Sequence, residues 1–210
     1  MVEVKERTTP KSRIESLSDL IFGLALSIGA LTLIGQSPKD FLGLVLAIMY
    51  YAFSFLILIS VWFGYTRIMA NLHVETRKTL YLNIVMLFLV SIEPFLFNTL
   101  LNGEIITQYV SILYSLDLGG LFLVQAILGN IVLAEKNMPP EVQRHHRLIR
   151  NSLIIGAAIF FISVIPVFWI LTIPLGNDTY IHLTFLIWLI PLFQRSIRHL
   201  WEKRYSKKTP

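Results

Sequence analysis

Cysteine is absent from this 210-residue chain, and charged residues make up only 15% of it. The lack of cysteine excludes disulfide bonds and thiol chemistry. The scarcity of charge accompanies 55% hydrophobic residues and a mean hydropathy of +0.66, which is more apolar surface than a soluble domain of this size can hide. The composition therefore predicts an integral membrane protein.

The sequence also lacks the short motifs that carry enzyme chemistry. It contains no Gly-rich phosphate loop, no His-Glu-x-x-His zinc helix and no Gly-x-Ser-x-Gly nucleophile elbow. We therefore expect neither enzymatic activity nor a bound cofactor. It contains no Thr-Val-Gly-Tyr-Gly loop either, whose carbonyl groups line the filter of ordinary potassium channels. If ions cross this protein, side chains of a helix must line their path.

Long apolar runs fill most of the chain. A helix that crosses the hydrocarbon core needs about 20 apolar residues, and six segments meet that demand. We therefore predict an all-α membrane protein that forms one domain over residues 1–210. The predicted spans are 18–35, 41–65, 80–101, 106–134, 151–173 and 179–200.

The basic residues are distributed unevenly between the predicted loops. All of the 18 Lys and Arg residues except Lys39 fall in the N-terminal arm, in the loops after the second and fourth spans, or at the C-terminal end. Because cytoplasmic loops carry the excess of Lys and Arg in membrane proteins, both termini are predicted to be cytoplasmic. The formal charge of +5 follows from this topology, so we expect no nucleic-acid partner.

The first predicted span carries an apolar stripe along one face. Leu20, Leu24, Ser27 or Ile28, and Leu31 follow one another in steps of three and four, which places them on one side of a helix. Glycine and alanine on the other faces make the helix thin enough for close packing. Spacing alone favours a packing helix inside a single-chain bundle, and the alternative is a helix that lines a pore.

A charged signature precedes this stripe. Arg13, Ser18 and Asp19 stand where the chain enters the membrane, and charge is costly at that depth. We expect a hydrogen-bonded network at the cytoplasmic end of the helix, which would lower the free-energy cost of placing Asp19 at the membrane boundary. We also expect Ser18 or Asp19 to cap helix N–H groups. An ion-attracting vestibule is the alternative.

The segment Arg13-Ile14-Glu15-Ser16-Leu17-Ser18-Asp19 resembles the Arg-x-x-x-Phe-Ser-Asp signature that opens the first helix of the transmembrane protein 175 family of potassium channels. It departs from that pattern at Leu17, where the family usually has Phe. Further similarity covers most of the chain and includes Phe22, Tyr50, Ser54, Phe55, Trp62, Leu82-Asn83 and Pro94-Phe95.

A second departure follows Trp62. The family has a pair of histidines after this tryptophan, whereas this chain has Tyr65, Thr66 and Arg67. Any contact network that uses those histidines must therefore be rebuilt or absent in this protein.

The resemblance implies a potassium channel of modest selectivity over sodium, without a re-entrant filter loop. It implies a homotetramer in a prokaryotic cell membrane, with the first helix around the pore and permeating potassium as its only metal. Carried over from Asp19, Leu24 stands at the hydrophobic constriction, Ser27 at the hydroxyl position and Leu31 at the outer apolar layer. Leu20 and Ile28 are possible additional lining residues.

Glu93 is the main competing clue, because it is an acid that precedes Pro94 in the third predicted span. We favour a place in a polar extracellular vestibule, ahead of a hydrogen-bonded role in packing. A third interpretation, a site that couples proton or cation movement to transport, gives the alternative function of a secondary transporter. A membrane scaffold without transport is a further alternative.

Overall fold

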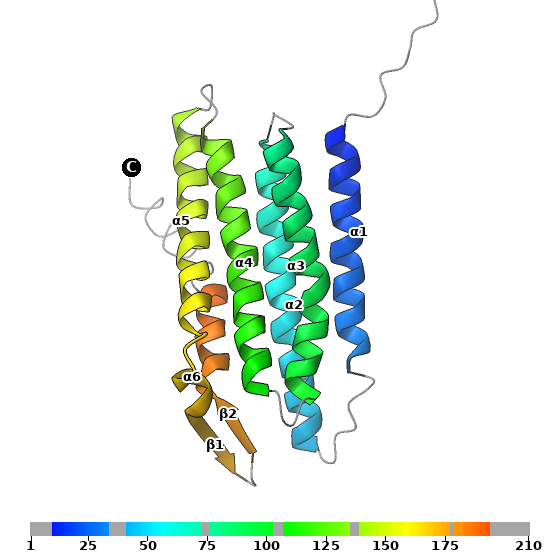
Figure 1. Cartoon of the computed structure of the whole chain (residues 1–210), viewed down its shortest axis with the longest axis vertical. Helices are drawn as coiled ribbons and strands as arrows, with labels where there is room; N and C mark the ends of the chain where they lie inside the picture. The colour runs from blue at the N-terminus through cyan, green and yellow to red at the C-terminus, as the bar shows by residue number, and fades with distance from the viewer. Residues whose placement is uncertain are drawn as a thin grey trace, which may run out of the picture.

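The computed structural model describes residues 10–33, 41–72, 76–102, 107–134, 139–176 and 179–193. Five long helices stand side by side and alternate in direction along the chain (Figure 1). They are α1 (Pro10–Leu31), α2 (Phe41–Ala70), α3 (Arg77–Asn102), α4 (Thr107–Leu133) and α5 (Pro140–Ile162).

The first four helices are long and apolar enough to cross a membrane. They contain between 22 and 30 residues, and a rise of about 1.5 Å per residue makes even the shortest comparable to the hydrocarbon thickness. The first four predicted spans are therefore confirmed as membrane-capable helices. The first helix begins at Pro10, earlier than the predicted residue 18, because its charged N-terminal turns are also helical.

The last two predicted spans differ from the structure. Instead of one helix over 151–173, α5 ends at Ile162 and is followed by the short helix α6 (Val167–Ile170) and strand β1 (Thr172–Gly176). Strand β2 (Thr179–His182) pairs antiparallel with β1, so the predicted span 179–200 begins as a strand. Among the described residues, the helical part of that span is Leu183–Phe193, which we call the final helix.

Proline explains much of this difference. Pro166 and Pro174 lack the backbone N–H that a helix interior requires, and Pro174 lies in β1 opposite Tyr180. At the other end of α5, Pro139 is the N-cap and Pro140 the first helical residue, a position that suits proline. The helix therefore starts in a polar segment that hydropathy left outside the span.

The core lies between α2, α3, α4, α5 and the final helix. Its aromatic centre joins Trp188 of the final helix to Tyr114 of α4, with ring centroids 4.9 Å apart, and to Phe53 of α2 at 6.2 Å. Close packing of α4 on α5 requires Gly156, because a Cβ there would lie 2.6 Å from the ring of Phe122. The bundle core is thus complete without the outer face of α1.

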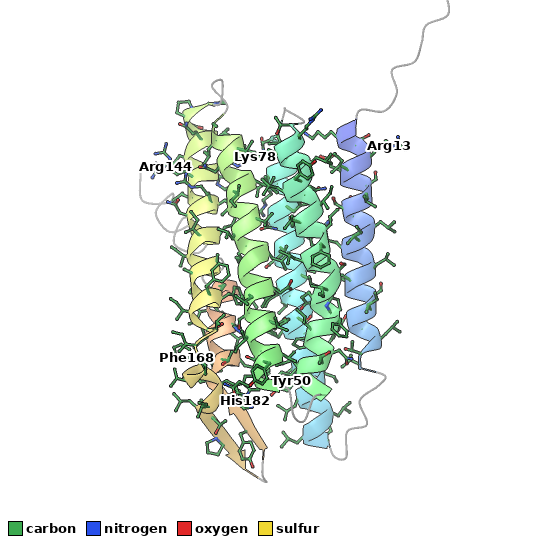
Figure 2. All side chains as sticks on the ribbon, in the orientation of Figure 1. Arg13, Tyr50, Lys78, Arg144, Phe168 and His182 are labelled. Atoms are coloured by element: carbon green, nitrogen blue, oxygen red, sulfur yellow. The ribbon has the colours of Figure 1, made fainter. Side chains whose placement is uncertain are left out.

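Charge is concentrated at one end of the bundle. Arg13, Lys78 and Arg144 lie at the end where α1, α3 and α5 begin, whereas Tyr50, Phe168 and His182 lie at the other end (Figure 2). At that second end His182 Nδ1 lies 2.6 Å from the carbonyl oxygen of Trp169, which ties β2 to α6. The asymmetry of basic residues in the sequence is therefore also an asymmetry in space.

Candidate functional site

The apolar stripe of α1 lies on the outside of the bundle. Leu20, Leu24, Ile28 and Leu31 are 59%, 53%, 49% and 61% exposed. Ser27 is exposed on the same side, and its hydroxyl donates to the carbonyl oxygen of Gly23 at 2.8 Å. These side chains therefore do not belong to the core of a single chain, which contradicts the interpretation of the stripe as internal packing.

The opposite face of α1 is bound firmly to the bundle. Phe22 and Ala25 are buried, and the Phe22 ring lies 6.0 Å from that of Tyr65 on α2. Gly29 is also buried, where a Cβ would contact Tyr51 at 3.6 Å. The helix is therefore anchored on one side and leaves a row of exposed leucines on the other.

Two side-chain hydrogen bonds join the charged signature to α2. The Ser18 and Tyr65 hydroxyls lie 2.8 Å apart, and Ser18 also donates to the carbonyl oxygen of Ile14. Trp62 Nε1 donates to Asp19 Oδ1 at 2.9 Å. The predicted network therefore includes Ser18 and Asp19.

Two details of the predicted signature are wrong. Arg13 is exposed, and among the described residues no hydrogen bond or ion pair connects it to Ser18 or Asp19. Neither of those two residues caps helix N–H groups, because α1 begins at Pro10 and both lie in its interior. The helix α1 has additional turns before residue 18. These turns put Arg13 on the side of the helix that faces away from the bundle.

Tyr65, one of the residues that follow Trp62 in place of the family's histidines, contacts the signature directly. Its ring is 1% exposed and its hydroxyl is bonded to Ser18, so a neutral phenol holds the signature serine. In this chain the signature is thus bonded to α2 through Tyr65 and Trp62.

Glu93 lies inside the bundle. It is fully buried, and its Oε1 atom accepts hydrogen bonds from Ser54 on α2 at 2.8 Å and from Tyr114 on α4 at 2.9 Å. The predicted place in an extracellular vestibule is thus wrong for the described chain, because the acid lies between three helices. The hydrogen-bonded packing role matches this geometry, although Glu93 Oε2 has no bonded partner.

Asp117 is a second buried acid that our sequence reasoning missed. It lies on α4 one turn after Tyr114, is 4% exposed, and neither carboxylate oxygen has a hydrogen-bond partner. A lone aspartate in the middle of the predicted span 106–134 was the available signal, because intramembrane acids are rare. Glu93 and Asp117 together make the inside of the bundle unusually polar.

Amides provide further links between helices. Gln125 Nε2 of α4 donates to the carbonyl oxygen of Val61 on α2, and Arg150 of α5 donates to Asn130 Oδ1 at 3.0 Å. Polar side chains of this kind join helices in a bilayer. Within the described residues no group of three or more His, Cys, Asp and Glu could hold a metal ion.

Comparisons with known proteins found similarity in sequence over part of the chain and in fold. Residues 13–94 match the family model described as the endosomal/lysosomal potassium channel TMEM175. This segment contains most of α1, all of α2 and the first part of α3. No curated protein sequence matches the chain significantly.

The fold is similar to that of a lysosomal potassium-selective channel TMEM175 homolog from Chamaesiphon minutus, known from its crystal structure. The two chains are 18% identical with a TM-score of 0.61, and the similarity covers 91% of this chain and 98% of that one. At this identity the comparison shows a shared fold. The chain is therefore similar to the TMEM175 family over residues 13–94, which include the signature and the exposed stripe, and it shares the fold of this channel homolog.

Proposed function

We propose that this chain is one subunit of a potassium-selective channel whose pore is lined by α1 from each of four identical subunits. The observation that carries the proposal is the exposed row of Leu20, Leu24, Ile28 and Leu31 on a helix whose opposite face is bonded into the bundle. A helix held in this way can present its free face to a central axis. Four copies would surround that axis with leucine side chains.

Leu24 forms the narrowest apolar layer in this proposal. A ring of four leucines makes a constriction that excludes water and closes by dewetting. An ion that crosses it must lose water, and potassium holds its hydration shell less tightly than sodium. The neck therefore favours potassium to a modest degree without a carbonyl filter. Leu31 forms the outer apolar layer, with Leu20 and Ile28 as additional lining residues.

Ser27 supplies oxygen to the ion one turn from Leu24. Because its hydroxyl proton is donated to Gly23, the lone pairs of Ser27 Oγ remain available as acceptors. A cation that has lost water requires such acceptors. The backbone bond of Ser27 thus orients the hydroxyl for a cation rather than for an anion.

The membrane orientation follows from charge. The end of the bundle with Arg13, Lys78 and Arg144 (Figure 2) faces the cytoplasm, as the positive-inside rule requires. Both termini are cytoplasmic in this arrangement, and the protein is a multi-pass protein of a prokaryotic cell membrane. Its partners are potassium ions, lipid and further copies of itself.

The transporter alternative depends on Glu93 as a coupling site. The bonds from Ser54 and Tyr114 favour a packing role for this acid. We therefore expect Glu93→Gln to leave the channel current largely intact, because the amide keeps an acceptor oxygen for both hydroxyls. A transporter would lose flux with this change and keep it with Leu24→Ala.

The proposal is tested by bilayer current from purified protein under a bi-ionic potassium and sodium gradient. Wild type should show a reversal potential directed toward potassium. Leu24→Ala should widen the neck, raise the conductance and move the reversal potential toward zero. Leu113→Ala on α4 is a matched control, because Leu113 is also 53% exposed but lies outside α1. Equal currents from wild type and Leu24→Ala, with assembly intact, would remove Leu24 from the pore.

A further inference from the structure

A cavity of about 180 Å³ lies between α1, α2 and α3 at the basic end of the bundle. It is separate from the exposed stripe of α1, because it forms where the buried side of that helix meets its neighbours. Its walls are mostly apolar. They consist of Ile14 from α1, Met69 of α2, Leu72 just after that helix, and Leu80 of α3.

Two cationic side chains line the same cavity. Lys11 comes from the first turns of α1 and Arg77 from the start of α3. The Lys11 ammonium donates to the carbonyl oxygen of Leu72 at 2.8 Å, and an ammonium group has three protons to donate. None of the described lining residues is acidic. The charge of the cavity therefore favours an anion.

Hydroxyl groups lie beside these cations. The Thr76 and Thr79 hydroxyls line the cavity and are 3.0 Å apart, and Thr76 Oγ1 also accepts from the backbone N–H of Thr79. The start of α3 adds the positive end of its helix dipole near Arg77. Cations, hydroxyls and a helix start form a suitable environment for a phosphate group.

Asn83 gives the cavity a buried polar wall. Its side chain is 2% exposed and its Oδ1 atom has no hydrogen-bond partner among the residues that the structure describes, although buried polar atoms normally have one. Since Asn83 lines the cavity, a donor group of a bound molecule would satisfy this oxygen. A fully ionised inorganic anion has no such donor, whereas a molecule with an alcohol hydroxyl group keeps its donor at every physiological pH.

We propose that this cavity binds a phosphate ester that carries a free hydroxyl, with its phosphate at Lys11 and Arg77 and its hydroxyl donating to Asn83. The apolar walls contact the carbon skeleton of the ester. Two sources share this chemistry, namely the headgroup of phosphatidylglycerol in the adjacent leaflet and a soluble polyol phosphate such as glycerol 3-phosphate. Because Lys11 and Ile14 belong to α1, a bound ester joins α1 to α2 and α3.

Binding is measured with purified full-length protein in phosphatidylcholine nanodiscs, either containing phosphatidylglycerol or supplemented with glycerol 3-phosphate. The readouts are the dissociation constant of each probe and the midpoint of thermal unfolding. Lys11→Gln and Arg77→Gln should each weaken binding about tenfold, because each removes a charge-assisted contact. Lys78→Gln is the matched control, because it removes a neighbouring charge that does not line the cavity.

The pattern across probes and variants decides the outcome. Loss of phosphatidylglycerol binding in the two cavity variants, but not in Lys78→Gln, supports the site with a lipid as its source. If only glycerol 3-phosphate binds, and the two cavity variants lose this binding while Lys78→Gln keeps it, the site is supported with a soluble ester as its ligand. Equal loss in Lys78→Gln, or binding of neither probe, overturns the proposal.

Asn83→Leu tests the hydroxyl contact with all charges retained. It should weaken binding about tenfold, and unchanged binding in folded protein overturns the assignment of a hydroxyl-bearing ester. If this variant does not fold, the charge variants still decide the proposal.

Discussion

Asp117 is buried on α4 with both carboxylate oxygens unpaired, so it opposes the stability of the bundle. Asp117→Leu removes both unpaired oxygens and keeps a side chain of similar size, so it should stabilise the fold. We expect this change to raise the free energy of unfolding by about 1–3 kcal/mol, measured by denaturant or thermal unfolding in detergent. Glu141→Gln is a control, because Glu141 is exposed at the start of α5 and should give no increase. A less stable Asp117→Leu protein would mean that the carboxyl group has a partner.

His146 gives stability a dependence on pH. It is buried near the start of α5, before the predicted span 151–173, and burial followed by the charge of His145 lowers its pKa from 6.5. Since the folded pKa lies below the unfolded one, the unfolded state binds the proton more readily. Stability is therefore full above pH 6.5 and falls as the pH drops through 6.5 toward the lowered folded pKa.

The test is the unfolding midpoint in detergent between about pH 5 and pH 8, the range over which histidine titrates. His146→Gln should flatten its decline on the acidic side. His145→Gln, which changes the exposed neighbour, should keep most of the decline. Parallel pH curves for wild type and His146→Gln would assign the acid sensitivity to other groups.

At the scale of the element, the sequence predicts helices better than it predicts where they stop. α1 to α4 were predictable because uninterrupted apolar runs of spanning length leave a backbone in lipid few alternatives to a helix. The region after Ile162 was not, because hydropathy cannot distinguish an apolar strand from an apolar helix. Pro166 and Pro174 were the available signals for the break that separates α5, β1 and the final helix.

At the candidate site, too, the sequence predicted the features that depend on local helix geometry and not those that depend on packing between helices. The three-and-four spacing of Leu20, Leu24 and Leu31 predicted their common face, because helix geometry alone sets it. The bonds of Ser18 to Tyr65 and of Asp19 to Trp62 depend on how α1 packs against α2, which no local pattern contains. The departure after Trp62 indicated only that a contact network based on the family's histidines must be rebuilt or absent.

At the scale of the whole molecule, the proposed pore depends on how firmly each subunit holds its α1. Tyr65→Phe removes the hydroxyl that contacts Ser18 and leaves the buried ring in place. Because the core of α2 to α5 and the final helix does not use that hydroxyl, each subunit should still fold. The freed α1 should make the proposed tetramer less stable, so we expect a shift from tetramer toward smaller species.

Size-exclusion chromatography with light scattering, at matched protein and detergent concentrations, measures that shift. Tyr50→Phe is the matched control, because Tyr50 lies on the same helix at the opposite end of the bundle from Arg13 (Figure 2). Circular dichroism separates loss of assembly from loss of fold, since a Tyr65→Phe subunit should keep its helical signal. If Tyr65→Phe gives as much tetramer as Tyr50→Phe, assembly does not depend on the Ser18 contact. The packing of Phe22 and Ala25 would then suffice to hold α1 against the bundle.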